Sequence, residues 1–203
     1  MTTDEFTSDN ENSGVEALIS RCLQGDQFAY TQLYDRFAAG IYRLCYSLVL
    51  NRQDAEDVVQ EVFVYAFKNL HQYNPARAAF KTWLYTISVS RCRNTYRRKR
   101  LPQVGLSQIF QLNIAAPCSE APEAALAQRA AQDVLAIALA DLSPQLREAV
   151  VLRYGHGLIY REIADVMGCP PKTAESRVRL AHKRLRHILQ SQGRELLEEL
   201  LSF

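Results

Sequence analysis

Basic side chains and aromatic rings are concentrated between residues 68 and 100, a stretch that contains no Asp or Glu. Phe80, Trp83 and Tyr85 come just before a cationic run at residues 97–100. Aromatic rings stack on unpaired bases and cations follow the phosphate backbone, so this combination suits single-stranded or opening DNA. The chain's net charge is only +2, because acids elsewhere offset these cations. The stretch therefore predicts nucleic-acid binding that the average charge conceals.

Some of these rings are also expected to fill a core. Phe80, Leu84 and Ile87 recur at helical spacing and form one apolar stripe, whereas Trp83 suits either a core or a base. The basic side chains of the stretch are Lys68, Arg77, Lys81, Arg91, Arg93, Arg97, Arg98, Lys99 and Arg100.

A second basic stretch lies within a predicted helix-turn-helix, IYREIADVMGCPPKTAESRVRLAHKRL. Gly168 permits a left-handed helix end, and Pro171 suits the first turn of the next helix. The apolar residues expected to face inward are Ile163, Ala164 and Met167, followed by Ala174, Val178, Ala181, Leu185 and Ile188.

The opposite face of the second helix combines short or forked polar groups with cations. Glu175 is suited to accept a hydrogen bond from a cytosine amino group, and Arg179 to donate to a guanine edge. The flanking cations suit phosphates. This face and its flanks consist of Lys172, Thr173, Glu175, Ser176, Arg177, Arg179, His182, Lys183, Arg184 and Arg186. The alternative is an ordinary solvated face of a bundle helix, and the turn signature favours DNA reading over it.

The residue pattern gives little support to an enzyme. His71, His156, His182 and His187 are scattered, and neither a nucleophile elbow nor a phosphate loop occurs. Zinc-ligand spacing is missing among the cysteines, so we expect reduced thiols and neither metal nor cofactor; these are Cys22, Cys45, Cys92, Cys118 and Cys169. No signal peptide or long apolar run appears, which favours a cytoplasmic protein without membrane insertion.

Helical periodicity predicts an all-α fold of two small domains joined by a flexible linker, the second domain being a helix-turn-helix. Residues 1–14 are polar and are expected to form a flexible tail. The first domain is expected at residues 15–100, the linker at 101–122 and the second domain at 123–203. Pro102, Gly105, Pro117 and Pro122 break any helix in the linker.

The boundaries of the helices follow from caps and breakers. In the first domain we expect helices at about 15–23, 26–50, from 51–54 to about 70, and 79–99. In the second domain we expect helices at about 123–141, from Ser143-Pro144, at 159–167 and at 171–190, with one or two further turns in the tail.

The helix that begins near Asn51 is amphipathic. Its inward residues are expected to be Val58, Val59, Val62, Phe63, Ala66, Phe67 and Leu70. Its outward residues are Asp57, Gln60, Glu61 and Tyr65, which by themselves would suit a solvated face.

Three segments resemble the extracytoplasmic-function (group 4) sigma factors of the sigma-70 family. DAEDVVQEVFVYAF is similar to the family's polymerase-clamp-binding helix, and AFKTWLYTISVSRCRN to its promoter-melting element. DLSPQLREAVVLRYGHGLIYREIADVMGCPPKTAESRVRLAHKRL is similar to its minus-35-reading domain. The resemblance spans roughly Asp26 to Ile188. It implies an alternative sigma factor, without enzymatic activity, that binds core RNA polymerase and starts transcription of a specific regulon.

The resemblance also implies roles for individual residues. Asp57, Gln60 and Glu61 match positions that bind the clamp of the polymerase's largest subunit, and residues 73–79 match a loop that captures a flipped minus-10 base. Contacts to minus-10 DNA and its melting are implied for Tyr73, Asn74, Arg77, Phe80, Lys81, Trp83, Arg91, Arg93, Asn94, Arg97 and Arg98. Contacts to the minus-35 element are implied for Lys172, Thr173, Glu175, Ser176, Arg177, Arg179, Leu180 and Lys183.

Two positions depart from the family pattern. Family members often carry Lys or Arg in place of Glu175, and Arg in place of Leu180, so we expect this chain to read different minus-35 bases. Leu180 suits either a thymine methyl group or packing within the protein. The family also makes an anti-sigma factor a candidate partner, beside core polymerase and double-stranded and melted promoter DNA.

The main rival is a helix-turn-helix regulator that acts without being a polymerase subunit. This rival leaves the outward stripe of Asp57, Gln60 and Glu61 unexplained, and it predicts tight operator binding in the absence of polymerase. An enzyme or a purely structural helical protein explains neither of the two basic surfaces.

Overall fold

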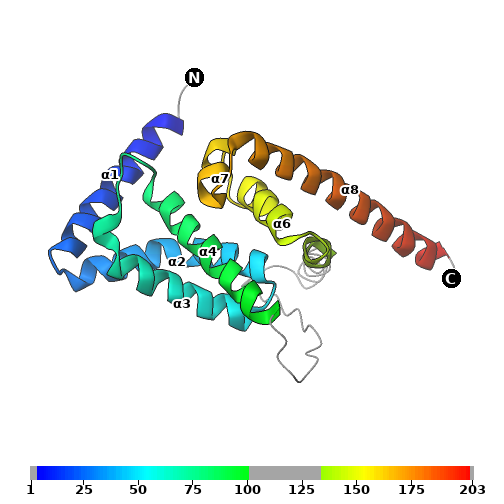
Figure 1. The fold of residues 1–203 in the computed structure, drawn as a ribbon, viewed down its shortest axis with the longest axis horizontal. Coiled ribbons are helices and arrows are strands. Elements are labelled where there is room, and N and C mark those ends of the chain that lie inside the picture. The colour runs from blue at the N-terminus through cyan, green and yellow to red at the C-terminus, as the bar shows by residue number, and fades with distance from the viewer. Residues whose placement is uncertain (1–3, 101–133, 202–203) are drawn as a thin grey trace.

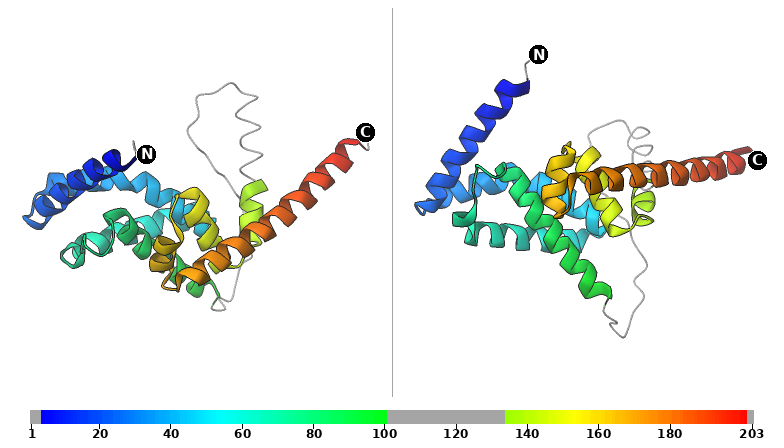
Figure 2. Two further views of the ribbon diagram at one scale, coloured as in Figure 1. Left: turned by 90° about the horizontal axis from the view of Figure 1, so that it is seen from above. Right: turned by 45° about the horizontal axis from the view of Figure 1, so that its top comes forward.

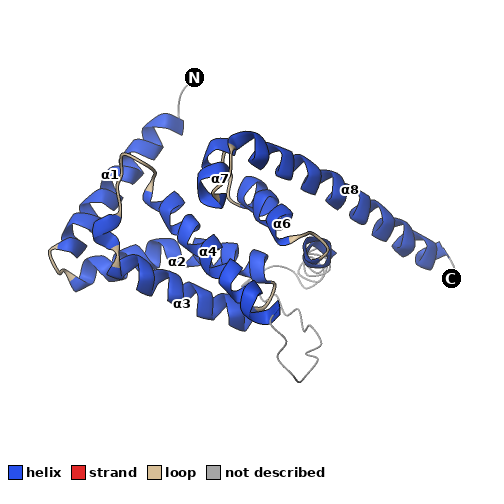
Figure 3. Ribbon diagram, viewed as in Figure 1, coloured by secondary structure: helices blue, strands red, loops and turns tan. Residues whose placement is uncertain are grey.

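The computed structural model describes residues 4–100 and 134–201, and every regular element in these ranges is a helix (Figures 1 and 3). An N-terminal unit consists of α1 (Asp4–Leu23), α2 (Gln27–Val49), α3 (Arg52–Lys68), the short η1 (Leu70–Gln72) and α4 (Phe80–Arg100). A C-terminal unit consists of helical residues 134–140, α6 (Pro144–Val150), the π-helical η2 (Val151–Gly155), α7 (Tyr160–Met167) and α8 (Pro171–Leu201). The predicted all-α fold with two helical parts is confirmed.

Side-chain caps fix the order of helices in the N-terminal unit. The Asp26 carboxylate accepts hydrogen bonds from the backbone N–H groups of Phe28 and Ala29, at the start of α2. At the other end of α2, Leu50 takes a left-handed φ of 55° and its N–H donates to the Tyr46 carbonyl. Asn51 then caps α3 through the Asp54 N–H at 3.0 Å. The apolar faces of α2, α3 and α4 meet in a common core.

The first helix is longer than the predicted 15–23, since α1 begins at Asp4. Residues 4–14 lack the apolar spacing that marks an amphipathic helix. They contain no proline that would interrupt a helix. Helix formation here therefore follows from propensity and continuity with the packed residues from Val15 onward.

The helix-turn-helix of the C-terminal unit forms as predicted. α7 ends at Gly168, which has a φ of 66°, and the Cys169 N–H donates to the Ala164 carbonyl at 3.0 Å. α6 begins at Pro144, although the Ser143 side chain makes no capping hydrogen bond. The last helix is longer than the predicted 171–190, because α8 continues through the tail as one helix to Leu201 and extends away from the other helices (Figure 2).

The two units pack against each other. α4 lies beside α7, and α2 lies beside η2 and α6, so buried residues of both units form one continuous cluster (Figure 1). The predicted linker at 101–122, and the first part of the helix predicted at 123–141, lie outside the described residues. Cys22, Cys45, Cys92 and Cys169 are free thiols, as expected. Among the described helices, none combines the length and apolar character needed to cross a membrane.

Candidate nucleic-acid interfaces and neighbouring grooves

One face of α8 carries the predicted minus-35 residues into solvent. Glu175, Ser176, Arg179 and Lys183 are exposed, whereas the opposite stripe of Ala174, Val178 and Ala181 is buried. Lys172 is exposed as well, and Thr173 and Arg177 are half-buried at the edges. Leu180 is 54% exposed, which excludes the alternative that it packs inside the protein.

The predicted minus-10 loop is shaped by its own backbone. The Asn74 side-chain oxygen accepts a hydrogen bond from the Ala76 N–H at 2.9 Å, and the Asn74 carbonyl accepts one from the Arg77 N–H. Arg77 is exposed. Asn74 is therefore engaged as the turn-forming residue, and Arg77 is the loop's accessible cation.

Phe80 is predicted to contact minus-10 DNA, but in the structure it is a core residue. Its side chain is only 1% exposed and packs edge-to-face against Phe37 and Tyr73, at ring distances of 5.3 and 5.2 Å. Phe80 opens α4 with its ring packed between Phe37 of α2 and Tyr73, which follows η1, so a base cannot reach it in this arrangement.

Trp83 remains accessible on the outer side of the same aromatic cluster. Its indole is half-buried and lies 5.5 Å from Tyr73 and 5.6 Å from Phe80. The Tyr73 hydroxyl is buried without a hydrogen-bond partner among the described residues, and burial raises the pKa of this hydroxyl. A neutral, unpaired hydroxyl and a partly exposed indole thus sit side by side at the start of α4.

The basic residues of α4 differ in availability. Lys81, Asn94 and Arg97 are exposed, and the Arg91 guanidinium lies over the Tyr65 ring at 4.7 Å. Arg98 forms an exposed ion pair with Glu61 at 3.4 Å, and such pairs are weak and easily exchanged for another partner.

Arg93 points to the C-terminal unit instead of solvent. Its Nε and Nη2 donate to the two carboxylate oxygens of Glu148 at 3.0 and 2.7 Å. The sequence-based expectation that Arg93 faces DNA is therefore not met in this arrangement, because a buried carboxylate of α6 already occupies its donors.

One member of the outward stripe of α3, Gln60, lines a groove of about 410 Å³. Asp57 and Gln60 are exposed and Glu61 is half-buried, as a binding surface requires. The groove is lined by Tyr34, Ala38, Ala39 and Tyr42 from α2 and by Glu56, Val59 and Gln60 from α3. Sequence analysis missed the α2 wall, although Tyr34, Ala38 and Tyr42 recur every four residues and so share one helix face.

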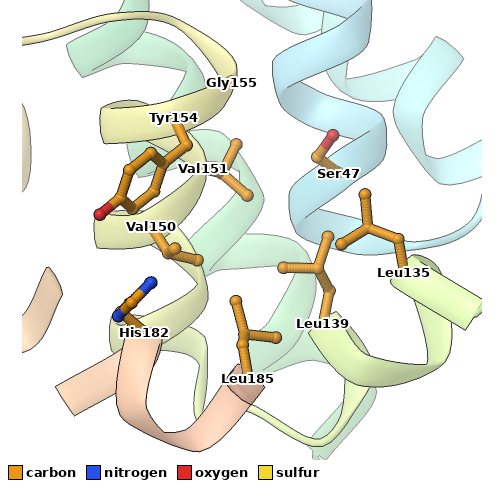
Figure 4. A pocket seen from close by; sticks show the side chains of 9 residues that line it. All are labelled: Ser47, Leu135, Leu139, Val150, Val151, Tyr154, Gly155, His182 and Leu185. Atoms are coloured by element: carbon orange, nitrogen blue, oxygen red, sulfur yellow. The ribbon is translucent and has the colours of Figure 1, made fainter. Parts of the chain in front are cut away.

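A second groove, of about 360 Å³ and mostly apolar, lies between the two units (Figure 4). Its lining comes from α2, from residues 134–140, from α6 and η2, and from α8, and consists of Ser47, Leu135, Leu139, Val150, Val151, Tyr154, Gly155, His182 and Leu185. The Tyr154 side chain on its rim is 64% exposed. Sequence analysis did not find this groove, because its walls come from segments far apart in the chain.

Comparison with known proteins adds independent findings. The family Sigma-70 region 2 matches residues 33–101, and the family Sigma-70, region 4 matches residues 133–185. The RNA polymerase sigma-H factor of Pseudomonas aeruginosa is 31% identical over 186 residues, which cover 89% of this chain and 96% of the relative. The ECF RNA polymerase sigma-E factor of Haemophilus influenzae is 29% identical, over 86% of this chain and 95% of the relative.

Solved structures show the same fold. CnrH in complex with the cytosolic domain of CnrY superposes with a TM-score of 0.65 at 26% identity, over 86% of this chain and 96% of CnrH. RpoE in complex with the anti-sigma factor NepR from Bartonella quintana superposes with a TM-score of 0.62 at 25% identity, over 79% of this chain and 96% of RpoE. Both family regions occur in order, in a chain that aligns with these sigma factors over nearly their full length. The chain therefore belongs to the extracytoplasmic-function group of the sigma-70 family, alternative sigma factors that bind core RNA polymerase and recognise promoters.

Proposed function

We propose that this sigma factor binds the polymerase clamp with the groove between α2 and α3, opens the minus-10 element with α4 and its preceding loop, and reads the minus-35 element with α8. The observation that carries the proposal is the groove beside Gln60, because a regulator that acts on DNA alone has no need of it. In this scheme residues 15–100 and 123–203 are the two binding domains, and residues 101–122 link them.

The groove suits a helix with cationic side chains. Tyr34 and Tyr42 supply broad apolar walls, while Glu56 and Gln60 supply acceptors along the α3 edge. Asp57 and Glu61 lie on α3 outside the lining of the groove. Aromatic anchors surrounded by a polar rim are typical of energetically important protein contacts. The Arg98–Glu61 pair is exposed, so Glu61 can exchange its partner at low cost.

Promoter opening is assigned to the accessible members of the α4 surface. Trp83 offers a face for stacking, and Lys81, Asn94 and Arg97 are exposed along the same helix. Stacking of about 1–3 kcal/mol per base offsets part of the cost of unstacking the duplex. Binding energy, and not bond chemistry, accounts for this activity, so we assign the chain no enzymatic function.

Both DNA contacts belong to one molecule, which makes the second contact nearly intramolecular. A tether converts two weak sites into one strong interaction through effective concentration. Because chromosomal DNA and polymerase are the partners, we place this activity in the cytoplasm.

We further propose that an anti-sigma factor occupies the apolar groove between the units. The solved relative RpoE is itself bound to the anti-sigma factor NepR, and CnrH is bound to the cytosolic domain of CnrY. In the native host, Tyr154→Glu is expected to release the factor and raise transcription from its promoters. Tyr160→Glu, an exposed tyrosine outside the groove, serves as the control and is expected to have no effect. Unchanged transcription in Tyr154→Glu would rule out this groove as the binding site of the anti-sigma factor.

The central proposal is tested with purified core polymerase. The double variant Asp57→Ala/Gln60→Ala is expected to lower affinity for core at least about tenfold, a loss of about 1.4 kcal/mol. Asp165→Ala, an exposed acid on α7, is the matched control. If the wild-type chain fails to bind core and yet occupies specific operators alone, the conventional regulator is the correct function.

A further inference from the structure

We propose that Glu148 holds the free protein closed by occupying Arg93, and that promoter DNA and Glu148 compete for this guanidinium. The competition rests on the proposed function, which assigns Arg93 to the minus-10 surface. The closure rests only on the contacts between the two units.

The contact has the geometry of a forked ion pair. Nε and Nη2 of Arg93 donate to Oε1 and Oε2 of Glu148 at 3.0 and 2.7 Å. Nη2 also donates to the Met167 carbonyl at 3.3 Å, near the end of α7. The Glu148 side chain is 1% exposed and that of Arg93 is 36% exposed. This pair therefore joins α4 of the N-terminal unit to α6 and α7 of the C-terminal unit.

Glu148 is directed at the N-terminal unit. Besides its ion pair with Arg93, it lies close to Cys92 and Tyr96, both on α4. The contact with Cys45 and burial chiefly raise the pKa of Cys92, burial chiefly raises the pKa of the Tyr96 hydroxyl, and the negative charge of Glu148 adds to both. A carboxylate in such a position is buried by the contact between the units. When the units separate, both partners of the pair regain water.

Other contacts between the units are also polar. The Tyr85 hydroxyl and His156 Nδ1 are hydrogen-bonded at 2.9 Å, and Arg147 Nη1 donates to the Leu48 carbonyl at 2.7 Å. Hydrogen bonds of this kind exchange for bonds to water with a small net change in free energy. Buried ion pairs likewise fix an arrangement more than they stabilise it. The polar contacts thus fix the geometry of the closed state, and the ion pair among them is open to competition.

A DNA phosphate is a suitable competitor. Carboxylate and phosphate both present paired oxygens to the guanidinium fork, so one can replace the other on Arg93 without rearrangement of its donors. The reading face of α8 is exposed in the closed state, whereas the Arg93 donors are engaged. Closure therefore leaves the minus-35 surface accessible and withholds part of the minus-10 surface.

The closure is tested by small-angle X-ray scattering on the full chain without polymerase. Glu148→Gln removes the charge and is expected to increase the radius of gyration at unchanged helicity. Asp141→Asn is the control, because Asp141 pairs with Arg184 within the C-terminal unit at 3.6 Å. A charge exchange keeps the test decisive if Glu148→Gln folds poorly. Arg93→Glu alone is expected to open the protein, and Arg93→Glu/Glu148→Arg to close it again. Equal radii for wild type, Glu148→Gln and Arg93→Glu would overturn the proposal.

The competition is tested with a fluorescein-labelled, mixed-sequence single strand of about 20 nucleotides. Glu148→Gln is expected to bind the labelled strand about fivefold more tightly than the wild type does. The reason is that the apparent affinity for DNA is proportional to the fraction of protein molecules in the open state. Asp141→Asn, which loses the same charge, is expected to bind as wild type does. An open Glu148→Gln with unchanged DNA affinity would refute the competition and leave the closure intact. Failure of every variant to bind DNA or core polymerase would instead refute the proposed function.

Discussion

The Arg147 guanidinium of α6 donates to the carbonyl of Leu48, near the end of α2, over 2.7 Å. The Tyr96 hydroxyl of α4 donates to the same carbonyl. Arg147 also caps the C-terminal end of the helix at residues 134–140, because it donates hydrogen bonds to the carbonyls of Leu139, Ala140 and Leu142. One buried cation thus satisfies carbonyls at the ends of two helices from different units, where the helix dipoles favour positive charge.

Arg147→Met is expected to destabilise the protein by about 3 kcal/mol. The substitution keeps most of the side-chain volume but leaves buried carbonyls without donors, which carries a large desolvation cost. Urea denaturation followed by circular dichroism measures the loss. Arg161→Met, at an exposed position on α7, is expected to change stability by less than about 0.5 kcal/mol. Similar small effects for both variants would show that water replaces the guanidinium at these carbonyls.

Trp83→Ala is expected to impair promoter opening more than polymerase binding. Loss of one stacking partner costs about 2 kcal/mol, or about thirtyfold in the opening equilibrium. Permanganate reactivity of unpaired thymines measures opening, and co-sedimentation with core measures binding. Ile87→Ala, at a buried position of the same helix, is expected to lower both through stability alone. An equal loss of opening and binding in Trp83→Ala would make Trp83 a core residue only.

On α8, Arg179→Ala and Lys183→Ala are expected to differ in kind. Loss of a bidentate base contact in Arg179→Ala should cost about 1–3 kcal/mol and relax specificity at one minus-35 position. Loss of a phosphate contact in Lys183→Ala should weaken binding to all sequences. It should also reduce the slope of the logarithm of the binding constant against the logarithm of the salt concentration by about 1. Holoenzyme titrations against a promoter library at several salt concentrations distinguish the two. Uniform weakening in both variants would mean that Arg179 contacts only the backbone.

The contact between Tyr85 and His156 predicts a loss of stability in acid. Burial, with Lys81 and Arg43 nearby, lowers the pKa of His156 to about 4, below the value of about 6.5 expected in the unfolded chain. Because the folded pKa is depressed, His156 contributes stability that is present above pH 6.5 and declines as the pH falls toward 4. The pKa of Tyr85 is raised to about 12, so its hydroxyl stays neutral throughout.

This dependence is measured as the thermal midpoint at a series of pH values. The wild type is expected to lose more stability between about pH 6.5 and pH 4 than His156→Gln, which has no imidazole to protonate. Carboxylates that titrate in the same pH range affect both proteins alike, so their effect cancels in the difference between the two thermal midpoints. Parallel pH profiles would show that His156 remains solvated in the folded protein.

Local signals in the sequence determined the helices and the two candidate DNA surfaces. Asp26 and Asn51 mark helix starts, Gly168 marks a helix end, and the stripe of Ala174, Val178 and Ala181 fixes which face of α8 is buried. These features depend on interactions within a few residues of the chain. A single sequence therefore contains enough information to predict them.

Tertiary structure alone decided which members of each surface are accessible. Phe80 and Trp83 lie three residues apart on one helix, yet packing against Phe37 of α2 and against Tyr73 buries the first, whereas the second stays partly exposed. Arg93 and Glu148 are separated by 55 residues, so no local pattern predicts their pairing. Periodicity defines the apolar face of each helix, but which charge meets which, and which ring is covered, depends on how the helices pack together.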